Sequence, residues 1–356
     1  MSGSIALIVG ISGITGRALA AYLGTLSSWT AVGISRHSHD DLGAIKRADV
    51  DLTDSNATAA AVAALGKPTH VFFVTWARQP TELKNCEVNG AMFRNAVQAA
   101  AVAGGLQHVA LVTGLKHYMG SFENYALSEL DTPFSEEMPR VAGPNFYYTQ
   151  EDILFELAAR YGFTWSVARP HTIIGYAPGN AMNLSTSLAV YAILCRETAR
   201  KFVFPGSPQQ YTGLTDMTDA GLLARHLVWS STTPAAANTA FNVVNGDVFR
   251  WKKLWRQIAD YFGIDVAPYP GEAQPLAQSL ADVGSDWDRI VRKYELLPNK
   301  VEHIAPWWHV DADLGRTQET LTDMSLSRER GFVEYQRTST AVMRLFDHLR
   351  RRRVIP

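Results

Sequence analysis

A glycine triplet near the N-terminus restricts this chain to very few folds. Residues 10–16 read GISGITG and follow directly on the apolar run at residues 5–9. Gly10, Gly13 and Gly16 allow a tight strand-to-helix turn in which backbone N–H groups approach a pyrophosphate at the start of the helix. Ser12 and Ile14 lie in the same turn. We therefore expect a dinucleotide here; the alternative is a glycine-rich turn without a ligand.

The first half of the chain alternates strand-like and helix-like segments. Strand candidates occur at residues 5–9, 30–35, 70–74, 107–112 and 164–170, separated by helical patterns at 15–26, 54–65, 87–103 and 147–160. This order predicts an α/β fold with a doubly wound parallel sheet, a Rossmann domain.

The second half is less regular, and its sequence predicts a discontinuous domain. A strand at residues 241–244 indicates that the chain re-enters the sheet, and Asp247 is a candidate cap for a following helix that ends at Gly263. We expect a dinucleotide-binding domain at residues 1–175, rejoined by about 211–245. A smaller, mainly helical substrate-binding part would comprise residues 176–210 and 246–356.

Composition argues against several classes of partner. The 356 residues carry a net charge of −1, which provides no strong attraction for nucleic acid or an anionic membrane. Cys86 and Cys195 are too few for a disulfide framework, so a cytoplasmic location is expected. The uncharged stretch 170–195 contains Gly, Pro and Asn, and a buried helix with its preceding loop explains it better than a membrane span. We expect no metal site.

The end of the second predicted strand favours NADP over NAD. An NAD site carries an acid there, whereas residues 33–37 read GISRH. Arg36 and Ser35 can both donate hydrogen bonds to a 2′-phosphate. The alternative for Arg36 is a surface arginine at a strand end. Asp51 follows a further short strand and would either contact the adenine amino group or cap a helix.

Lys116 and Tyr147 are the candidate reacting residues. Enzymes with this glycine spacing normally carry Tyr-x-x-x-Lys, but the residue four positions after Tyr147 is Glu151. Lys116 instead follows the strand that ends near Thr113, and the helix starting near Tyr147 should dock beside the same strand end. Both side chains can donate a hydrogen bond to charge developing on a substrate oxygen. The alternatives are a surface lysine and a core tyrosine.

The chain resembles the progesterone 5-beta-reductase and iridoid synthase-like family, called PRISE, within the extended short-chain dehydrogenases. The resemblance covers nearly the whole chain. The matching stretches are residues 7–10 with the glycine triplet, 71–77, 85–87, 92–95, 113–120, 145–148, 151–152, 165–167, 182–184, 241–243, 245–249 and 307–308.

This resemblance implies an NADPH-dependent reduction of an activated carbon–carbon double bond. The functional lysine and tyrosine of the family match Lys116 and Tyr147, and its phosphate-binding arginine matches Arg36. Two positions depart from the family pattern. His37 stands where a second arginine is usual, which weakens the expected preference for NADP, and Ser121 replaces a proline in the loop that carries Phe122.

Conjugate reduction agrees with this set of residues. Hydride attack on the β-carbon of an enone leaves enolate charge on the carbonyl oxygen, where Tyr147 and Lys116 would each contribute about 3 kcal/mol. No strong general base is needed, because the α-carbon can take its proton from water. Thr75 and Thr113, at neighbouring strand ends, complete the expected cofactor contacts together with Tyr147. An apolar pocket for a small enone would be lined by Trp76, Tyr118, Met119, Phe122, Tyr148 and Trp308, all of which are also ordinary core residues.

Two other functions stay open at this point. A carbonyl reductase or epimerase of the same fold would yield an allylic alcohol rather than a saturated ketone. A non-enzymatic NADP-sensing regulator would give Lys116 and Tyr147 no reason to converge. The sequence also leaves a homodimer open.

Overall fold

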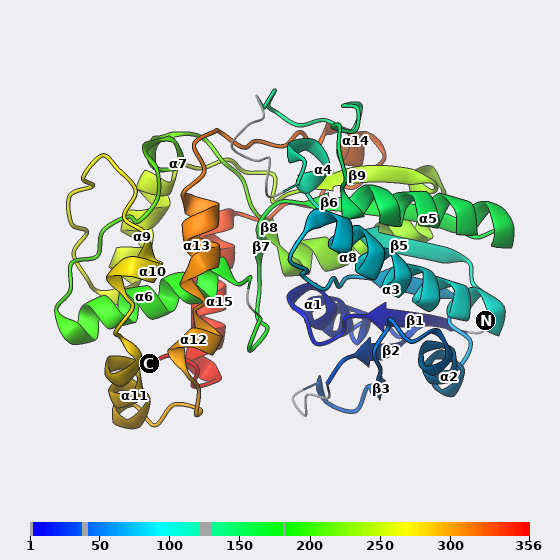
Figure 1. Ribbon diagram of the computed structural model, residues 1–356, viewed down its shortest axis with the longest axis horizontal. Coiled ribbons are helices and arrows are strands. Elements are labelled where there is room, and N and C mark those ends of the chain that lie inside the picture. The colour runs from blue at the N-terminus through cyan, green and yellow to red at the C-terminus, as the bar shows by residue number, and fades with distance from the viewer. Residues whose placement is uncertain (1–2, 38–41, 122–129, 181) are drawn as a thin grey trace.

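The computed structural model describes residues 3–37, 42–121, 130–180 and 182–356. Figure 1 shows two lobes, one a sheet flanked by helices that contains the N-terminus and the other a helical lobe that contains the C-terminus. The strands of the sheet end where the two lobes meet. Ligands of open α/β sheets bind beyond the carboxyl ends of the strands, so this junction is the place to look for a site.

Seven parallel strands form the sheet. They are β1 Ser4–Val9, β2 Trp29–Ser35, β3 Lys46–Asp49, β4 His70–Phe73, β5 His108–Val112, β6 Thr164–Pro170 and β9 Thr239–Val243. Their order across the sheet is β3-β2-β1-β4-β5-β6-β9, and every neighbouring pair is parallel. The predicted doubly wound parallel sheet is confirmed.

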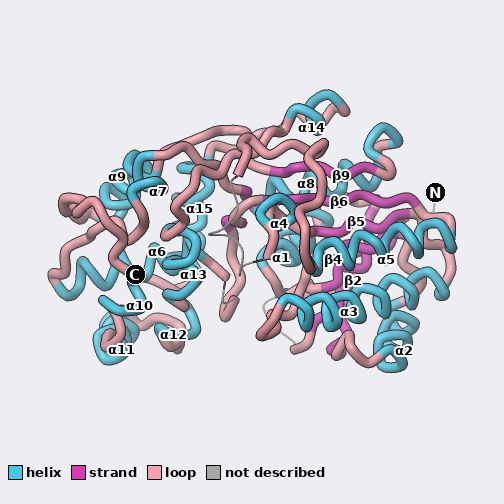
Figure 2. Tube along the Cα trace, turned by 45° about the horizontal axis from the view of Figure 1, so that its top comes forward, coloured by secondary structure: helices cyan, strands magenta, loops and turns pink. Residues whose placement is uncertain are grey.

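Helices cover both faces of this sheet (Figure 2). In the first lobe these are α1 Ile14–Leu23, α2 Ser55–Leu65, α3 Glu82–Ala103, α4 Lys116–Met119, α5 Phe146–Tyr161 and α8 Ala220–Thr232, with a short 3₁₀ helix at Pro234–Ala236. Helices α2, α3 and α5 share one apolar core with the strands, and α1 and α8 share the core on the opposite face. In β1, Leu7 and Val9 enter the first core while Ala6 and Ile8 enter the second. This alternation explains why the strand reads as an unbroken apolar run.

The second lobe packs its helices around one buried core. They are α6 Leu184–Thr198, α7 Pro208–Thr212, α9 Trp251–Phe262, α10 Leu276–Ser279, α11 Gly284–Lys293, α12 Val301–Ile304, α13 Trp307–Leu314 and α15 Thr338–Arg351. Helix α6 is buried along residues 184–195, in agreement with the helix expected from the uncharged stretch. Among the described helices, none has the length and apolar character that crossing a bilayer requires.

The start of α9 differs from the prediction, and Asp247 does not cap it. Helix α9 begins at Trp251, with Arg250 at the cap position. The carboxylate of Asp247 instead accepts hydrogen bonds from the backbone N–H of Thr338, at 2.9 Å, and from its hydroxyl, at 2.7 Å. Asp247 therefore fixes the start of α15, a partner 91 positions away in sequence. Gly263 ends α9 at a φ of 65°, as expected.

Late segments of the chain return to the first lobe. Helix α14, Ser325–Glu329, lies against β9, and the N–H of Phe134 donates to the carbonyl of Leu321 at 2.8 Å. Two short paired strands, β7 Ile173–Ile174 and β8 Thr218–Asp219, lie at the junction of the lobes. The predicted domain boundaries stay a prediction.

Candidate active site

The glycine turn has the shape that a pyrophosphate requires. Gly13 occupies the cap position of α1 and offers no side chain to the first N–H groups of the helix. Gly10 has a φ of 98°, and a Cβ there would lie 2.5 Å from Cβ of Thr75. A Cβ on Gly16 would lie 2.2 Å from the carbonyl oxygen of Gly10. The turn therefore leaves an uncapped helix start next to the ends of β1 and β4, which fits a dinucleotide.

Neighbouring residues hold this turn in place. The carbonyl of Ser12 accepts a hydrogen bond from Nε of Arg17 at 2.8 Å. Ile14 is buried, and its side chain fills the space beside Gly175, where a Cβ would lie 2.5 Å from it. The start of α1 is thereby attached to the β7 region at the junction of the lobes.

The residues predicted to read the adenosine end lie at the ends of the neighbouring strands β2 and β3. Arg36 and Asp51 are exposed, and the charge of Arg36 contributes to lowering the pKa of Asp51, after the larger effect of hydrogen bonds from Thr53. Asp54 caps α2, so Asp51 is not the helix cap that the sequence left as an alternative. The hydroxyl of Ser35 is engaged internally, where it lies 3.0 Å from the carbonyl of His37 and 3.3 Å from the carboxylate of Asp49.

Lys116 is buried rather than a surface lysine, and it is paired. It is the first residue of α4, and 3% of it is exposed. Its ammonium forms an ion pair with the carboxylate of Glu82, the first residue of α3. The ammonium also lies 4.4 Å from the ring centroid of Phe146 and 5.9 Å from that of Tyr147. The two predicted reacting residues therefore lie at the same place.

Glu82 was not predicted from the sequence, although it organises the site. One carboxylate oxygen accepts the N–H of Phe146 at 2.8 Å, and the other pairs with Lys116. Asn145 caps α5 by accepting the N–H of Tyr147 at 3.1 Å, and it donates to the carbonyl of Lys116 at 2.9 Å. The starts of α3, α4 and α5 are thus joined around Glu82.

Tyr147 places its phenol over the carboxyl end of β5. Its hydroxyl lies 3.3 Å from the position that a Cβ on Gly114 would occupy, and the carbonyl oxygen of Pro170 lies 3.2 Å from the same position. Gly114 therefore permits the approach of the phenol. Burial and the charge of Glu82 raise the pKa of Tyr147 above its ordinary value of 10.0. The phenol therefore keeps its proton at neutral pH and can donate a hydrogen bond there.

The position of the usual lysine carries a structural acid. Glu151 is 2% exposed, and its carboxylate lies 3.2 Å from Arg169, 3.0 Å from Arg140 and 3.4 Å from Nδ1 of His117. Burial alone would raise the pKa of Glu151, but the hydrogen bond with His117 and the charge of Arg169 lower it to about 2. This carboxylate is ionised and holds α5 to β6.

The predicted pocket residues fall into two groups. Tyr118 and Tyr148 are buried with their hydroxyls engaged, Tyr118 donating to Asn242 at 2.6 Å and Tyr148 accepting the N–H of Val141 at 2.9 Å. Met119 is buried in the same small core as Tyr118. These three side chains are therefore buried core residues that support the site. Phe122 lies outside the described residues.

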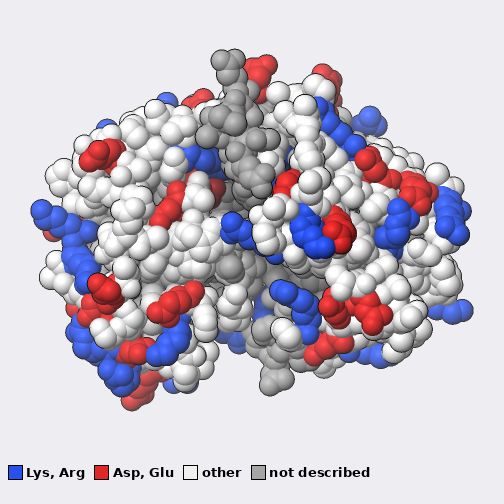
Figure 3. Space-filling model, in the orientation of Figure 1, with Lys and Arg blue, Asp and Glu red and all other residues white. Residues whose placement is uncertain are grey.

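The two tryptophans lie closer to the junction. Trp76 is partly buried and stacks on Phe146 with ring centroids 5.2 Å apart. Trp308, on α13 of the helical lobe, is 38% exposed, and the guanidinium of Arg78 lies 4.3 Å from its ring centroid. Arg78 follows β4 in the first lobe, so this contact crosses from one lobe to the other. Figure 3 shows a depression between the lobes, with acidic and basic side chains mixed over the visible face.

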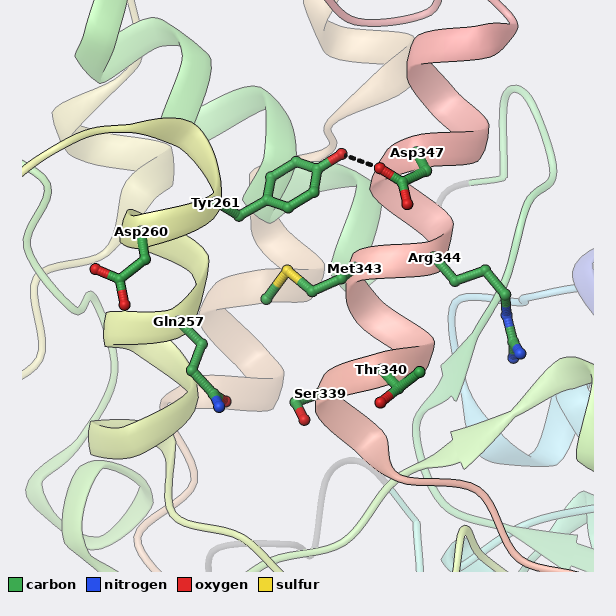
Figure 4. Close-up of a pocket in the computed structure, with 8 residues that line it drawn as sticks. All are labelled: Gln257, Asp260, Tyr261, Ser339, Thr340, Met343, Arg344 and Asp347. Atoms are coloured by element: carbon green, nitrogen blue, oxygen red, sulfur yellow. Dashed lines mark hydrogen bonds between the residues drawn. The ribbon is translucent and has the colours of Figure 1, made fainter.

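A separate groove lies between α9 and α15, as Figure 4 shows. It has a volume of about 500 Å³ and is crossed by the hydrogen bond from Tyr261 to Asp347, 2.7 Å long. None of the residues that line it belongs to the glycine turn or to the cluster around Lys116. It is therefore distinct from the candidate active site.

Comparison with known proteins identifies the family. The PRISE-like Rossmann-fold domain matches residues 40–356. The chain belongs to this family. One relative, the (S)-8-oxocitronellyl enol synthase of Nepeta racemosa, is 38% identical over 363 residues, covering 99% of this chain and 93% of that protein. The 3-oxo-Delta(4,5)-steroid 5-beta-reductase of Arabidopsis thaliana is 36% identical over 363 residues, with the same coverage of both chains. The resemblance inferred from sequence motifs is confirmed.

Solved structures of low sequence identity share the fold of this PRISE-like chain. The UDP-glucose 4-epimerase of Thermotoga maritima superposes with a TM-score of 0.68 at 12% identity, covering 98% of this chain and 99% of that one. WbmH of Bordetella bronchiseptica, solved in complex with NAD⁺, gives a TM-score of 0.66 at 16% identity over the same shares. At such identities the likeness concerns the fold alone, and it agrees with the predicted extended short-chain dehydrogenase architecture.

Proposed function

We propose that this protein is an oxidoreductase acting on CH–CH groups that reduces the activated carbon–carbon double bond of enones with NADPH. The observation that carries the proposal is the convergence of Lys116 and Tyr147 at the carboxyl end of β5, in a chain of the PRISE-like family. Its relatives include a reductase of 3-oxo-Delta(4,5)-steroids, which are enones by name. The function expected from the sequence agrees with these relatives.

The residues of this protein that are suited to bind NADPH lie at the carboxyl ends of the strands. The uncapped start of α1 and the turn at Gly10, Gly13 and Gly16 would hold the pyrophosphate, and Arg36 would pair with the 2′-phosphate. Bound NADPH would supply a hydride to the β-carbon of the substrate. Asp51 would lie at the adenine, and Thr75 and Thr113 at the ends of β4 and β5.

Tyr147 and Lys116 would act on the carbonyl oxygen of the substrate. Because the pKa of Tyr147 is raised, its phenol keeps its proton and donates a hydrogen bond to the oxygen as enolate charge develops. Lys116 adds a positive charge nearby, which Glu82 balances in the resting site. A neutral donor and a balanced ion pair suit stabilisation of a transient oxyanion better than removal of a proton.

The two alternatives are less well supported. Oxidation or epimerisation of an alcohol needs a base, and a raised pKa opposes that role for Tyr147. At the position of the usual lysine, Glu151 is held by Arg169, Arg140 and His117. A sensor without chemistry would not need Lys116 and Tyr147 beside each other. A cytoplasmic location and a homodimer stay predictions.

The test is product analysis with a simple cyclic enone. We expect purified protein to consume NADPH in the presence of 2-cyclohexenone and to form cyclohexanone, identified by gas chromatography and mass spectrometry. Formation of the allylic alcohol would favour the carbonyl reductase instead. Tight NADPH binding without turnover of a broad panel of enones and enals would contradict the proposal.

A further inference from the structure

Phe146 contacts both members of the buried ion pair in the candidate active site. Its backbone N–H donates to one carboxylate oxygen of Glu82 at 2.8 Å. The ammonium of Lys116 lies over its ring, 4.4 Å from the ring centroid. Phe146 is 1% exposed and is the first residue of α5, so it directly precedes Tyr147. One residue thus binds the acid through its backbone and the cation through its side chain.

Two aromatic neighbours fix the orientation of the Phe146 ring. Trp76, which follows β4, stacks on it with the ring centroids 5.2 Å apart and the planes at 18°. The ring of Tyr147 lies against it at a centroid distance of 4.4 Å and an angle of 59°. Contacts between aromatic rings at such distances are favourable and prefer particular geometries. The ring of Phe146 therefore presents a defined face to the ammonium of Lys116.

The ammonium of Lys116 lies too deep for water to stabilise its charge. Lys116 is 3% exposed and its partner Glu82 is 6% exposed. A buried charge must be stabilised by groups of the protein, and the groups around this ammonium include one carboxylate and one aromatic face. The quadrupole of an aromatic ring attracts a cation, and the attraction is strongest where water is excluded. The ring of Phe146 therefore contributes to the binding of the charge.

The carboxylate and the ring hold the ammonium in different ways. Glu82 carries a full negative charge, and on its own it would draw the ammonium towards the start of α3. The ring of Phe146 has no acceptor atom, so it attracts the positive charge without neutralising it. The same ammonium lies 5.9 Å from the ring centroid of Tyr147. The ring therefore keeps positive charge beside the residue proposed to donate to the enolate.

We propose that Phe146 is a positioning residue that holds the ammonium of Lys116 beside the phenol of Tyr147. This inference rests on the proposed reduction of enones, in which Lys116 adds positive charge near the carbonyl oxygen of the substrate. Phe146 acts through Lys116: its ring determines where the charge lies, and Glu82 provides the counter-charge. Replacing the ring should therefore impair turnover without impairing the binding of the cofactor.

The test removes the aromatic face and keeps an apolar side chain. In Phe146→Met the flexible methionine refills most of the space that the ring leaves. We expect kcat for 2-cyclohexenone to fall about five- to thirtyfold, as the loss of a desolvated cation–π contact allows, while the Kd for NADPH changes less than about twofold. Phe146→Leu serves in the same way if methionine is not accommodated.

The matched control is Phe93→Met on α3. The ring of Phe93 is fully buried and packs on Phe73 in the apolar core between α3 and the sheet, with the ring centroids 4.9 Å apart. This variant loses an aromatic contact of the same kind at a position away from the ion pair. It should lower the Tm to a similar extent as Phe146→Met and leave kcat unchanged. An equal loss of kcat in the two variants would contradict a role of Phe146 through Lys116.

A double-mutant cycle separates positioning from packing. Its reference protein combines Lys116→Met with Glu82→Gln, which removes the ammonium and its counter-charge together. If Phe146 acts through the ammonium, Phe146→Met should change kcat less than about twofold in this reference. It should also lower the midpoint of urea unfolding by less in the reference than in wild-type protein, and this measurement needs no turnover.

The two readouts distinguish this inference from the proposed reaction. If Phe146→Met lowers kcat equally in both backgrounds, or leaves it unchanged in wild-type protein, the inference is refuted. If wild-type protein reduces no enone, the proposed reaction fails. Unequal shifts of the urea midpoint would then still show that the ring of Phe146 holds the ammonium of Lys116, and equal shifts would refute that contact as well.

Discussion

The ammonium of Lys116 and the carboxylate of Glu82 form a buried ion pair between the first residues of two helices, α4 and α3. The same carboxylate accepts the first N–H of α5, which carries Tyr147. Position and charge of the lysine are therefore coupled to the position of the phenol. Glu82 is a positioning residue in this arrangement, because it contacts Lys116 and the backbone of α5.

Replacing Glu82 should destabilise the protein and reduce its activity. In Glu82→Gln the ammonium of Lys116 is left buried without a counter-charge, which costs about 3–5 kcal/mol when a buried pair is broken. Urea unfolding followed by circular dichroism measures this loss. The matched control is Glu87→Gln on the same helix, where an exposed pair with Lys84 contributes at most about 1 kcal/mol. Equal effects of the two substitutions would contradict the coupling.

The two adjacent tyrosines should separate chemistry from stability. Tyr147→Phe removes the proposed donor to the enolate, and kcat should fall about 100- to 1,000-fold while the affinity for NADPH is kept. Tyr148→Phe removes the hydroxyl that bonds to Val141 and His117, and it should lower stability by about 1–3 kcal/mol with little effect on kcat. Enone turnover and thermal melting of both variants provide the comparison. A Tyr147→Phe enzyme with wild-type kcat would rule out the proposed role.

The pH profile of kcat should show no ionisation of a required base in the neutral range. Tyr147 acts in its protonated form, and its pKa is raised above the ordinary 10.0, so activity assigned to this group is present below pH 10 and is lost only above it. Steady-state rates at saturating NADPH and enone between neutral pH and pH 10 test this. An increase of kcat with an apparent pKa near 7 would instead indicate that a base is required.

Arg36 should determine the choice of cofactor. Removing its guanidinium in Arg36→Ala deprives the 2′-phosphate of a charge-assisted bond of about 1.5–3 kcal/mol, so the Kd for NADPH should rise about 10- to 100-fold. The Kd for NADH, which has no 2′-phosphate, should change little and serves as the internal control. Fluorescence titration with both cofactors measures the ratio. If the affinity for both cofactors fell equally, Arg36 would have a structural role.

Glu151 should contribute to stability above acidic pH. Its folded pKa of about 2 lies below the ordinary 4.5, so its stabilisation is fully present above about pH 4.5 and is lost as the pH falls towards 2. The Tm of wild-type protein should therefore exceed that of Glu151→Gln at neutral pH, and the two should approach each other in this acidic window. Glu156→Gln, which affects an exposed and solvent-screened pair with Arg94, should show a much smaller change of Tm in this window. If the difference in Tm between wild type and Glu151→Gln stayed the same at every pH, the charge of Glu151 would not be the cause of the stabilisation.

Much of the fold was predictable because its signals are local. The apolar run before Gly10 and the alternation with helical segments predicted the order of strands, since a strand that is buried on both faces is apolar at nearly every position. Helix starts were less predictable. Helix α3 begins at Glu82 instead of residue 87. Asp247 does not cap α9, because its carboxylate binds Thr338 at the start of α15, far along the chain.

The candidate site was predicted only in part, because sequence motifs identify functional residues but not the residues, distant in sequence, that contact them. The tyrosine and lysine motifs pointed to Tyr147 and Lys116, which the structure brings together. Glu82 has no local signature beyond its place at a helix start, and its partner is 34 positions away in sequence.

The return of α14 to β9 has a consequence for how this protein is made. The amide of Asn242 donates to the carbonyl of Asp323 at 3.1 Å, so the last strand of the sheet is completed by residues 81 positions downstream. During synthesis the edge of the sheet at β9 therefore stays uncovered, and the nucleotide-binding lobe stays incomplete, until most of the chain has left the ribosome. Severing the polypeptide after β9 would therefore yield an aggregation-prone fragment rather than an autonomous cofactor-binding module.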